Sequence, residues 1–235
     1  MEYANNKQND EDSSRENNIF LKSINFYSPN IWLDLATGRI QNIPKIELNE
    51  DNTNYFFNIK SEHFDMHYAE MLHIFYLSFQ QKLTKEEKII AFIRWNEKKL
   101  PFCAYTIVYV TLLFSNKIKP LIIGNELPNL DFILKKCQNQ AWDLTYLSFW
   151  STLYWDEKHE NTSYLFSTMD KDLITIFINY HNMGSNLFIR CLGKVKGSTV
   201  EKEYREIIKN RVKPEINEAF VNNLIQSEKD NLINL

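Results

Sequence analysis

Apolar residues recur every three or four positions through the middle of the chain, which is the period of an amphipathic helix. Ser61 is a suitable N-cap for the first of these segments, whose apolar stripe includes Leu72, Phe75 and Phe79. Thr84-Lys-Glu-Glu87 is a capping box at the start of the next one. Helices are predicted over about 62–82, 84–95, 101–115, 130–137, 144–150 and 172–180, with a short one at Ile31–Ala36 that ends at Thr37-Gly38.

Shorter apolar segments between these helices predict β-strands. They are Ile24–Tyr27, Tyr55–Ile59, Tyr164–Thr168 and Asn186–Cys191, with Pro120-Leu-Ile-Ile as a short strand or loop. Strands alternating with helices favour an α/β fold with a central, mainly parallel sheet in a three-layer α/β/α sandwich. The predicted organisation is a disordered tail over 1–18, a domain over 19–198 with a helical insertion at about 62–138, and a C-terminal helical extension over 199–235.

The composition of the chain excludes several classes of function. The 235 residues are 44% hydrophobic, enough for a sizeable core, and the net charge of -3 excludes a uniformly basic nucleic-acid coat. Neither G-x-G-x-x-G nor G-x-x-x-x-G-K-S/T, the two Gly-rich motifs that bind phosphate groups, occurs in the chain. Three widely spaced cysteines, Cys103, Cys137 and Cys191, favour reduced thiols over a disulfide framework. The longest apolar run, Phe102 to Phe114, is too short to cross a bilayer, so we expect a soluble, cytoplasmic protein with no membrane partner.

Two acidic motifs are the strongest chemical signal. Asp143 ends Asn139-Gln-Ala-Trp-Asp143 before an apolar helix, and Asp170 lies in Phe166-Ser-Thr-Met-Asp170-Lys-Asp172 after a predicted buried strand. Acids at the carboxyl end of a strand lie where α/β sheets place their sites. A divalent cation would relieve the repulsion between them. For each acid alone, the alternative interpretation is a helix N-cap.

Together with the segment Phe26-Tyr-Ser28-Pro-Asn30-Ile-Trp-Leu-Asp34, these motifs resemble the PIN-like domain, the fold of many metal-dependent ribonucleases. Thr168-x-Asp170 matches the family's Thr-x-Asp. The family ends its first strand with an Asp, where this chain has Ser28, or Asp34 one helical turn later. Glu70 is the best match for the family's helical acid, with Glu62 and Asp65 as competitors.

The resemblance implies a metal-dependent endoribonuclease, in a toxin or phage-defence setting, that acts on RNA or single-stranded DNA. Mg²⁺ or Mn²⁺ would activate the attacking water. The implied catalytic and metal-binding residues are Asp143, Asp170, Glu70 and Asp34, supported by Ser28, Asn30, Thr168 and Asp172.

Ser28 in the position of an Asp also supports a second interpretation, a PIN-like pseudoenzyme or interaction module. Its amphipathic C-terminal helices, Val200–Ile208 and Ile216–Ile225, would then bind a protein partner or an antitoxin. A third interpretation is a helical scaffold without nuclease ancestry, which a structure lacking a parallel sheet would establish.

Two smaller constellations compete with the acidic site. His63-x-x-x-His67-x-x-Glu70 places two imidazoles and a carboxylate on one helix face, a geometry compatible with zinc, whereas a polar helix face explains them equally well. A nucleophile–base pair would combine Cys137 or Cys103 with His159 or His181, against the commoner buried thiol.

Two surfaces could bind nucleic acid. The basic segment Lys194–Lys213 is either such a surface or a solvated helix face interleaved with Glu201, Glu203 and Glu206. The aromatic stripe that includes Trp142, Phe149 and Trp150 could stack on bases, although helical spacing favours a place in the core.

Overall fold

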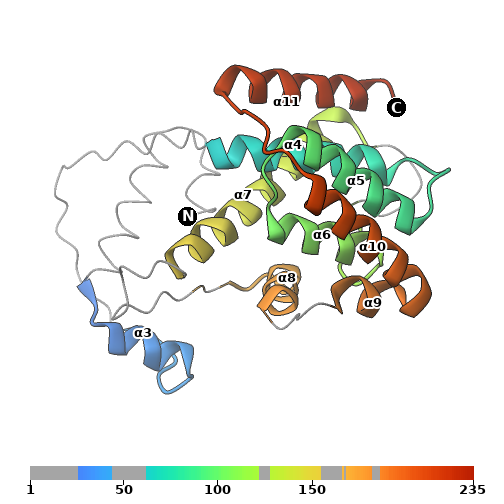
Figure 1. Cartoon of the computed structure of the whole chain (residues 1–235). Helices are drawn as coiled ribbons and strands as arrows, with labels where there is room; N and C mark the ends of the chain where they lie inside the picture. Colours follow the sequence, from blue (N-terminus) through green and yellow to red (C-terminus); the bar gives the residue numbers. More distant parts are fainter. Residues whose placement is uncertain (1–25, 44–61, 122–127, 155–165, 167, 182–185) are drawn as a thin grey trace. The chain divides into compact units, whose positions relative to one another are not determined.

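A computed structural model describes residues 26–43, 62–121, 128–154, 166, 168–181 and 186–235. The chain divides into two compact units, Met1–Ile59 and Lys60–Leu235. Every regular element in the described ranges is a helix (Figure 1). These helices are α3 (Pro29–Ala36), α4 (Glu62–Ser78), α5 (Lys85–Lys99), α6 (Ala104–Phe114), α7 (Leu130–Tyr154), α8 (Lys171–His181), α9 (Leu187–Leu192), α10 (Lys194–Asn210) and α11 (Glu218–Ile233).

The predicted α/β sandwich is therefore wrong, because the described part of the chain is all-α and contains no strand. Asn186–Cys191, predicted as a strand, forms α9 instead. A six-residue apolar run has no decisive period, so tertiary packing decides its structure. The predicted strand Tyr55–Ile59 lies outside the described residues, as do parts of Ile24–Tyr27, Pro120–Ile123 and Tyr164–Thr168.

Helix α7 corrects a second prediction. The sequence suggested one helix that ends near Cys137 and another that begins after Asp143, but Leu130–Tyr154 is one continuous helix. No Pro or Gly lies between these segments, so nothing interrupts the backbone hydrogen bonds. Asp143 lies inside α7 and does not cap a helix.

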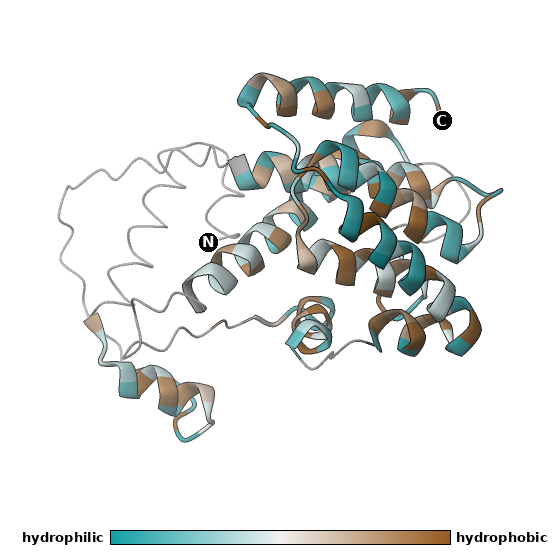
Figure 2. Cartoon of the chain, in the orientation of Figure 1, coloured by the Kyte–Doolittle hydropathy of each residue, from teal (hydrophilic) through white to brown (hydrophobic). Residues whose placement is uncertain are grey.

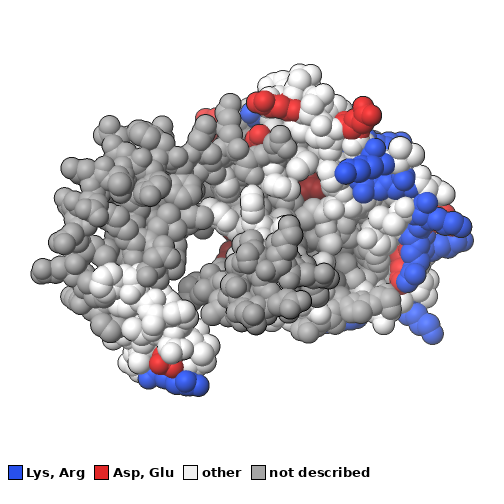
Figure 3. Space-filling view, turned by 60° about the vertical axis from the view of Figure 1, so that its left-hand side comes forward, with Lys and Arg blue, Asp and Glu red and all other residues white. Residues whose placement is uncertain are grey.

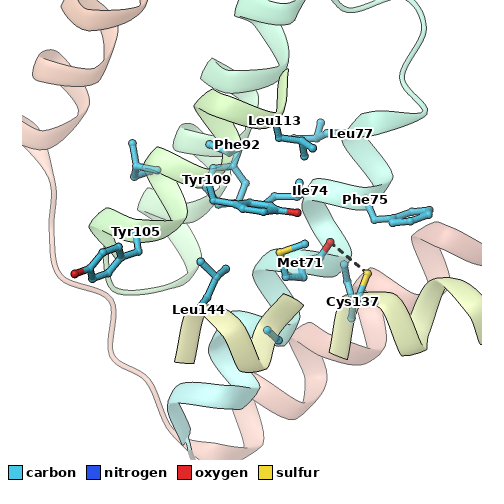
Figure 4. Packing of buried hydrophobic residues seen from close by; sticks show 14 of the residues in the cluster. Met71, Ile74, Phe75, Leu77, Phe92, Tyr105, Tyr109, Leu113, Cys137 and Leu144 are labelled. Atoms are coloured by element: carbon cyan, nitrogen blue, oxygen red, sulfur yellow. Dashed lines mark hydrogen bonds between the residues drawn. The ribbon is translucent and has the colours of Figure 1, made fainter. Parts of the chain in front are cut away.

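Helix α4 is the centre of the second unit. It packs against α7 and α11, and also against α5 and α6. Met71, Leu72, Ile74 and Phe75 are completely buried along it. Figure 4 shows side chains of α4 meeting those of α5, α6 and α7, and the Cys137 thiol donating to the Met71 carbonyl over 3.6 Å. Figure 2 shows the hydrophobic residues gathered on the helix faces that meet one another.

The predicted insertion and the predicted C-terminal extension both contribute to this core. Most of its buried residues belong to 62–138, and Val200 of α10 and Leu224 and Leu232 of α11 are buried in the same cluster. The boundary between the compact units lies between Ile59 and Lys60, within the segment predicted as a single domain.

Local signals at the helix ends are satisfied as the sequence predicts. In the capping box, the Glu87 amide donates to Thr84 Oγ1 over 3.3 Å and the Thr84 amide donates to Glu87 Oε2 over 2.8 Å. In the first unit, Pro29 opens α3, and the chain leaves it through Thr37 and Gly38, whose φ is 73°. Among the described residues, no helix is both long enough and apolar enough to cross a membrane.

Candidate functional site: a buried histidine between a carboxylate and a thiol

Two buried His–Glu pairs lie on opposite sides of α4. His67 is 4% exposed and pairs with Glu70, which is 1% exposed. His73 pairs with Glu228 of α11, which is 3% exposed. A buried carboxylate is costly unless its oxygens are hydrogen-bonded and its charge is balanced. Both sites therefore need a set of polar partners from neighbouring helices.

Glu70 receives three hydrogen bonds. His67 Nδ1 lies 2.7 Å from Glu70 Oε2, and Thr106 Oγ1 of α6 donates to the same oxygen over 2.8 Å. Asn96 Nδ2 of α5 donates to Glu70 Oε1 over 2.7 Å. Both carboxylate oxygens are thus occupied inside the helical core.

The other ring nitrogen of His67 faces a hydroxyl and a thiol. His67 Nε2 lies 3.0 Å from Ser148 Oγ of α7, and Ser148 Oγ lies 3.4 Å from Cys103 Sγ. Ser148 and Cys103 are half-buried residues. We call the whole set the His67 cluster; it consists of His67, Glu70, Asn96, Thr106, Ser148 and Cys103.

Electrostatics in the His67 cluster favour an ion pair. Burial alone would lower the pKa of His67, but the charge of Cys103 and the interactions with Cys103 and Glu70 raise this pKa to about 10. Burial alone would raise the pKa of Cys103, but the charge of His67 outweighs it and lowers the pKa, with help from the Ser148 hydroxyl. Each group therefore favours the charged form of the other: the charge of His67 lowers the pKa of Cys103, and the charge of Cys103 raises the pKa of His67.

Cys103 also occupies a reactive position on the backbone. It is the N-cap of α6, and its side chain makes no capping hydrogen bond. The first-turn amides of a helix lack intrahelical acceptors and create a positive potential. The positive potential favours a thiolate at Cys103. The free amides could also bind the oxyanion that forms when a thiolate attacks a carbonyl.

The second pair lacks a nucleophile. Glu228 Oε2 lies 2.9 Å from His73 Nδ1, and Trp95 Nε1 donates to Glu228 Oε1 over 2.9 Å. Asn231 Nδ2 donates to Glu228 Oε2 over 3.3 Å, and the rings of His73 and Trp95 stack with centroids 4.3 Å apart. These contacts join α4, α5 and α11, which is a structural role.

The acids predicted from the sequence have local partners. Asp143 Oδ2 accepts from Gln140 Nε2 over 3.3 Å. Asp170 Oδ1 accepts from the amides of Asp172 and Leu173 over 2.7 and 3.1 Å, and the Asp170 amide donates to Thr168 Oγ1 over 3.1 Å. The Thr-x-Asp motif therefore supports the N-terminus of α8, as the N-cap interpretation predicted.

The charges of acids in α7 and at the start of α8 nevertheless act on the same buried tyrosine. Burial raises the pKa of Tyr109 of α6 well above its usual value, and the charges of Asp143, Asp172 and Asp170 raise it further. Glu70, the helical acid of the predicted site, is hydrogen-bonded within the His67 cluster instead. Within the described ranges, no group of three or more His, Cys, Asp or Glu side chains could hold a metal ion.

The remaining predicted site residues belong to the first unit. Ser28 is the N-cap of α3 without a side-chain capping bond, and Asn30 is exposed in its first turn. Asp34 forms an ion pair with Arg39, with Oδ1 3.1 Å from Nη1. This pairing gives Asp34 a structural partner within α3 and the turn that follows it.

The competing constellations separate in the structure. His63 is exposed and packs edge-on to Phe149, whereas both ring nitrogens of His67 are already used. Cys137 is fully buried, and burial raises its pKa, so it is an inert core thiol. The predicted partner His159 lies outside the described residues, and His181 Nε2 lies 3.0 Å from the Tyr105 hydroxyl. Cys103 is thus associated with His67, a histidine that the sequence analysis considered as a zinc ligand or as part of a polar helix face.

The predicted docking helices use their apolar faces within the chain. Val200 of α10 and Val221, Leu224 and Ile225 of α11 are buried in the core. No family model, curated protein or solved structure matches the chain.

Sequence reasoning missed Asn96, Thr106 and Ser148. Asn96 follows Ile89, Phe92 and Ile93 at helical spacing, so it continues a buried stripe with a polar side chain. A polar residue in such a stripe needs a buried partner, and this was the available signal.

Proposed function

We propose that this chain is a cysteine-dependent acyl-transfer enzyme, a hydrolase or transferase with Cys103 as nucleophile. The observation that supports it is the order of groups around His67, with Glu70 on Nδ1 and the Ser148–Cys103 pair on Nε2. A nucleophile, a histidine and an orienting third group in this order form the general arrangement for covalent catalysis.

Each group has a defined task in the reaction. The Cys103 thiolate attacks the carbonyl carbon, a C–S bond forms, and the amides at the start of α6 stabilise the oxyanion. His67 gives its Nε2 proton, through Ser148 Oγ or directly, to the leaving group as the bond to that group breaks. Water or an acceptor alcohol or amine then attacks the thioester, its proton passes to His67, and the thiolate is restored. Glu70 holds the ring of His67 in place through its hydrogen bond with Nδ1.

The first test is the pH dependence of alkylation at Cys103. We expect iodoacetamide to modify Cys103 of the full chain at lower pH than it modifies Cys191, measured by peptide mass spectrometry. Cys191 is the internal control, because burial raises the pKa of its thiol. His67→Gln should move the Cys103 profile to higher pH, whereas His73→Gln, at the matched site without a thiol, should leave it in place. An ordinary thiol profile for Cys103 would contradict the proposal.

The second test is acyl transfer itself. With p-nitrophenyl acetate, the protein should release a burst of about one equivalent of nitrophenol as the thioester accumulates. Cys103→Ser should abolish the burst, whereas Cys191→Ser should retain it. A burst that survives Cys103→Ser and disappears with Ser148→Ala would assign the nucleophile to Ser148 instead.

A metal-dependent nuclease acting on RNA is the second candidate, although the described part of the chain lacks the parallel sheet on which the PIN-like resemblance depended. It is supported by the common effect of Asp143, Asp170 and Asp172 on Tyr109. Calorimetry with Mn²⁺ tests it: binding heat that Asp170→Asn removes, together with Mn²⁺-dependent cleavage of RNA, would favour this candidate. Absence of binding and cleavage at millimolar Mn²⁺ would remove it.

A further inference from the structure

Helices α5 and α10 lie side by side in parallel, and ion pairs join them at successive levels. Lys196 Nζ lies 2.7 Å from Glu86 Oε1 near their N-termini, and Arg94 Nη2 lies 2.7 Å from Glu203 Oε2 near their middles. Within α10, Arg205 pairs with Glu201. These three ion pairs offset part of the positive charge of the first and middle turns, as the solvated-face interpretation predicted.

The C-terminal ends of the two helices carry several cations without an ion pair to any described carboxylate, although the charge of Glu97 acts on one of them, Arg211. Arg211 Nη2, just after α10, donates to the Leu100 carbonyl, just after α5, over 2.7 Å, so the two ends meet. We call the cations around this junction the terminal basic cluster; it consists of Lys98, Lys99, Lys209, Arg211 and Lys213. Its four lysines are exposed and form no ion pair with any described carboxylate. Figure 3 shows Lys and Arg side chains gathered at the right of the view, with few acidic side chains among them.

The terminal basic cluster lies next to the proposed nucleophile. The Arg211 guanidinium lies over the ring of Phe102, 4.4 Å from its centroid, and Phe102 precedes Cys103. The chain between Leu100 and Cys103 spans at most about 11 Å. Arg211 Nε is buried without a hydrogen-bond partner, which is a cost that an anionic ligand close by would offset.

We propose that the acyl substrate of Cys103 carries a negatively charged group, a carboxylate or phosphate, which binds to the terminal basic cluster. This inference rests on the proposed function, because it assigns the substrate class of the same site. Arg211 is the anchor, since its guanidinium is already held by Phe102 and the Leu100 carbonyl and loses little freedom when an anion binds. Lys98 and Lys99 add charge from α5.

The expected size of the effect follows from Coulomb's law. One cation about 10 Å from an anion in water changes its local concentration by about twofold at low ionic strength. Two cations removed together should therefore change it by about fourfold. The effect should fade at high salt, because the Debye length is about 3 Å at 1 M.

The test compares two reagents that differ in charge. Iodoacetate and iodoacetamide form the same kind of C–S bond with Cys103 and release iodide, but only iodoacetate is an anion. The measured quantity is the ratio of the iodoacetate rate constant to the iodoacetamide rate constant at Cys103, determined on the full chain by mass spectrometry. We expect Lys98→Gln/Lys99→Gln to lower the ratio about fourfold and Arg211→Gln about twofold. Arg205→Gln removes one positive charge, as Arg211→Gln does, but from the ion-paired part of α10, so it should leave the ratio unchanged.

The outcomes separate this inference from the proposed function. Slow alkylation of Cys103 by both reagents would contradict the thiolate–imidazolium pair and the enzyme proposal. Fast alkylation of Cys103, with the same ratio in the wild type and in the double lysine variant, would overturn only the proposal that the substrate is anionic. Because Arg211→Gln also removes the bond to Leu100, the double lysine variant decides if the Arg211 variant fails to fold.

Discussion

Replacing Glu70 with Gln tests the central pair of the His67 cluster. The substitution keeps the size and removes the charge. Both oxygens of Glu70 accept hydrogen bonds, one of them from Asn96. Asn96 Oδ1 is buried without a partner, so rotation of the Asn96 amide could accept a bond from the new amide group. The hydrogen-bond geometry can thus be largely retained while the charge is lost.

The magnitude follows from the number of bonds. A hydrogen bond to a charged group contributes roughly 1.5–3 kcal/mol, against about 0.5–1.5 kcal/mol between neutral groups. Three bonds that each lose about 1 kcal/mol predict that Glu70→Gln lowers the free energy of unfolding by about 2–4 kcal/mol. Urea unfolding measures this difference.

The pH dependence adds a second signature. The pKa of folded His67 is raised to about 10 from 6.5, so its stabilising effect is fully present below pH 6.5 and is lost as the pH rises to 10. Glu70→Gln should lower this pKa. The stability difference between wild type and variant should therefore be largest below pH 6.5 and should shrink toward pH 10.

An NMR titration of the His67 ring gives the direct assay. In the wild type the ring signals should stay those of an imidazolium up to about pH 9, and in Glu70→Gln they should titrate at lower pH. Glu228→Gln is the matched control, because it removes the other buried carboxylate paired with a histidine of α4. A wild-type midpoint near 6.5, or an unchanged midpoint in Glu70→Gln, would refute the reasoning.

Three further predictions concern stability. Gly197→Ala would place Cβ 2.4 Å from Ile189 Cα, so α9 and α10 must separate. We expect the free energy of unfolding, measured in urea, to fall by about 2 kcal/mol or more. Ser198→Ala should change it little. Thr84→Ala removes the N-cap of α5 and should lower the melting temperature by about 2–4 °C, corresponding to roughly 1 kcal/mol. Burial would raise the pKa of Glu228, but the His73 hydrogen bond outweighs burial and lowers that pKa. The stability that Glu228 contributes is therefore lost as the pH falls below 4.5, the ordinary value for a glutamate. Glu228→Gln should flatten this acid limb of the unfolding curves.

Helices with clear apolar stripes or caps could be predicted from the sequence. The segment predicted at about 62–82 forms α4, the capping box opens α5, and the segment at 172–180 forms α8. Their signals are local, because capping and helical periodicity depend on residues close in sequence. The prediction of a sheet was wrong, since short apolar runs such as Asn186–Cys191 can be buried as helix or as strand.

The His67 cluster could be predicted only in part. Glu70 was singled out near a packed face, and Cys103 was considered as a nucleophile, but neither was connected with the other. Their association depends on Ser148, which lies 81 residues from His67 in the chain, and on how α4, α6 and α7 pack. Long-range contacts of this kind leave no periodic pattern in a single sequence.

The two histidine–glutamate pairs together fix the alignment of α4. His67 and His73 are six residues apart, so their side chains diverge by about 120° around the helix axis. Leucine and isoleucine faces tolerate small slides and rotations, whereas a hydrogen-bonded pair accepts one alignment only. One pair sets α4 against α6 and α7, and the other sets it against α5 and α11. Sliding α4 by a single residue would break the His73–Glu228 pair and the bonds that join the His67–Glu70 pair to Asn96, Thr106 and Ser148. The polar contacts therefore select one arrangement among several that the apolar core would accept.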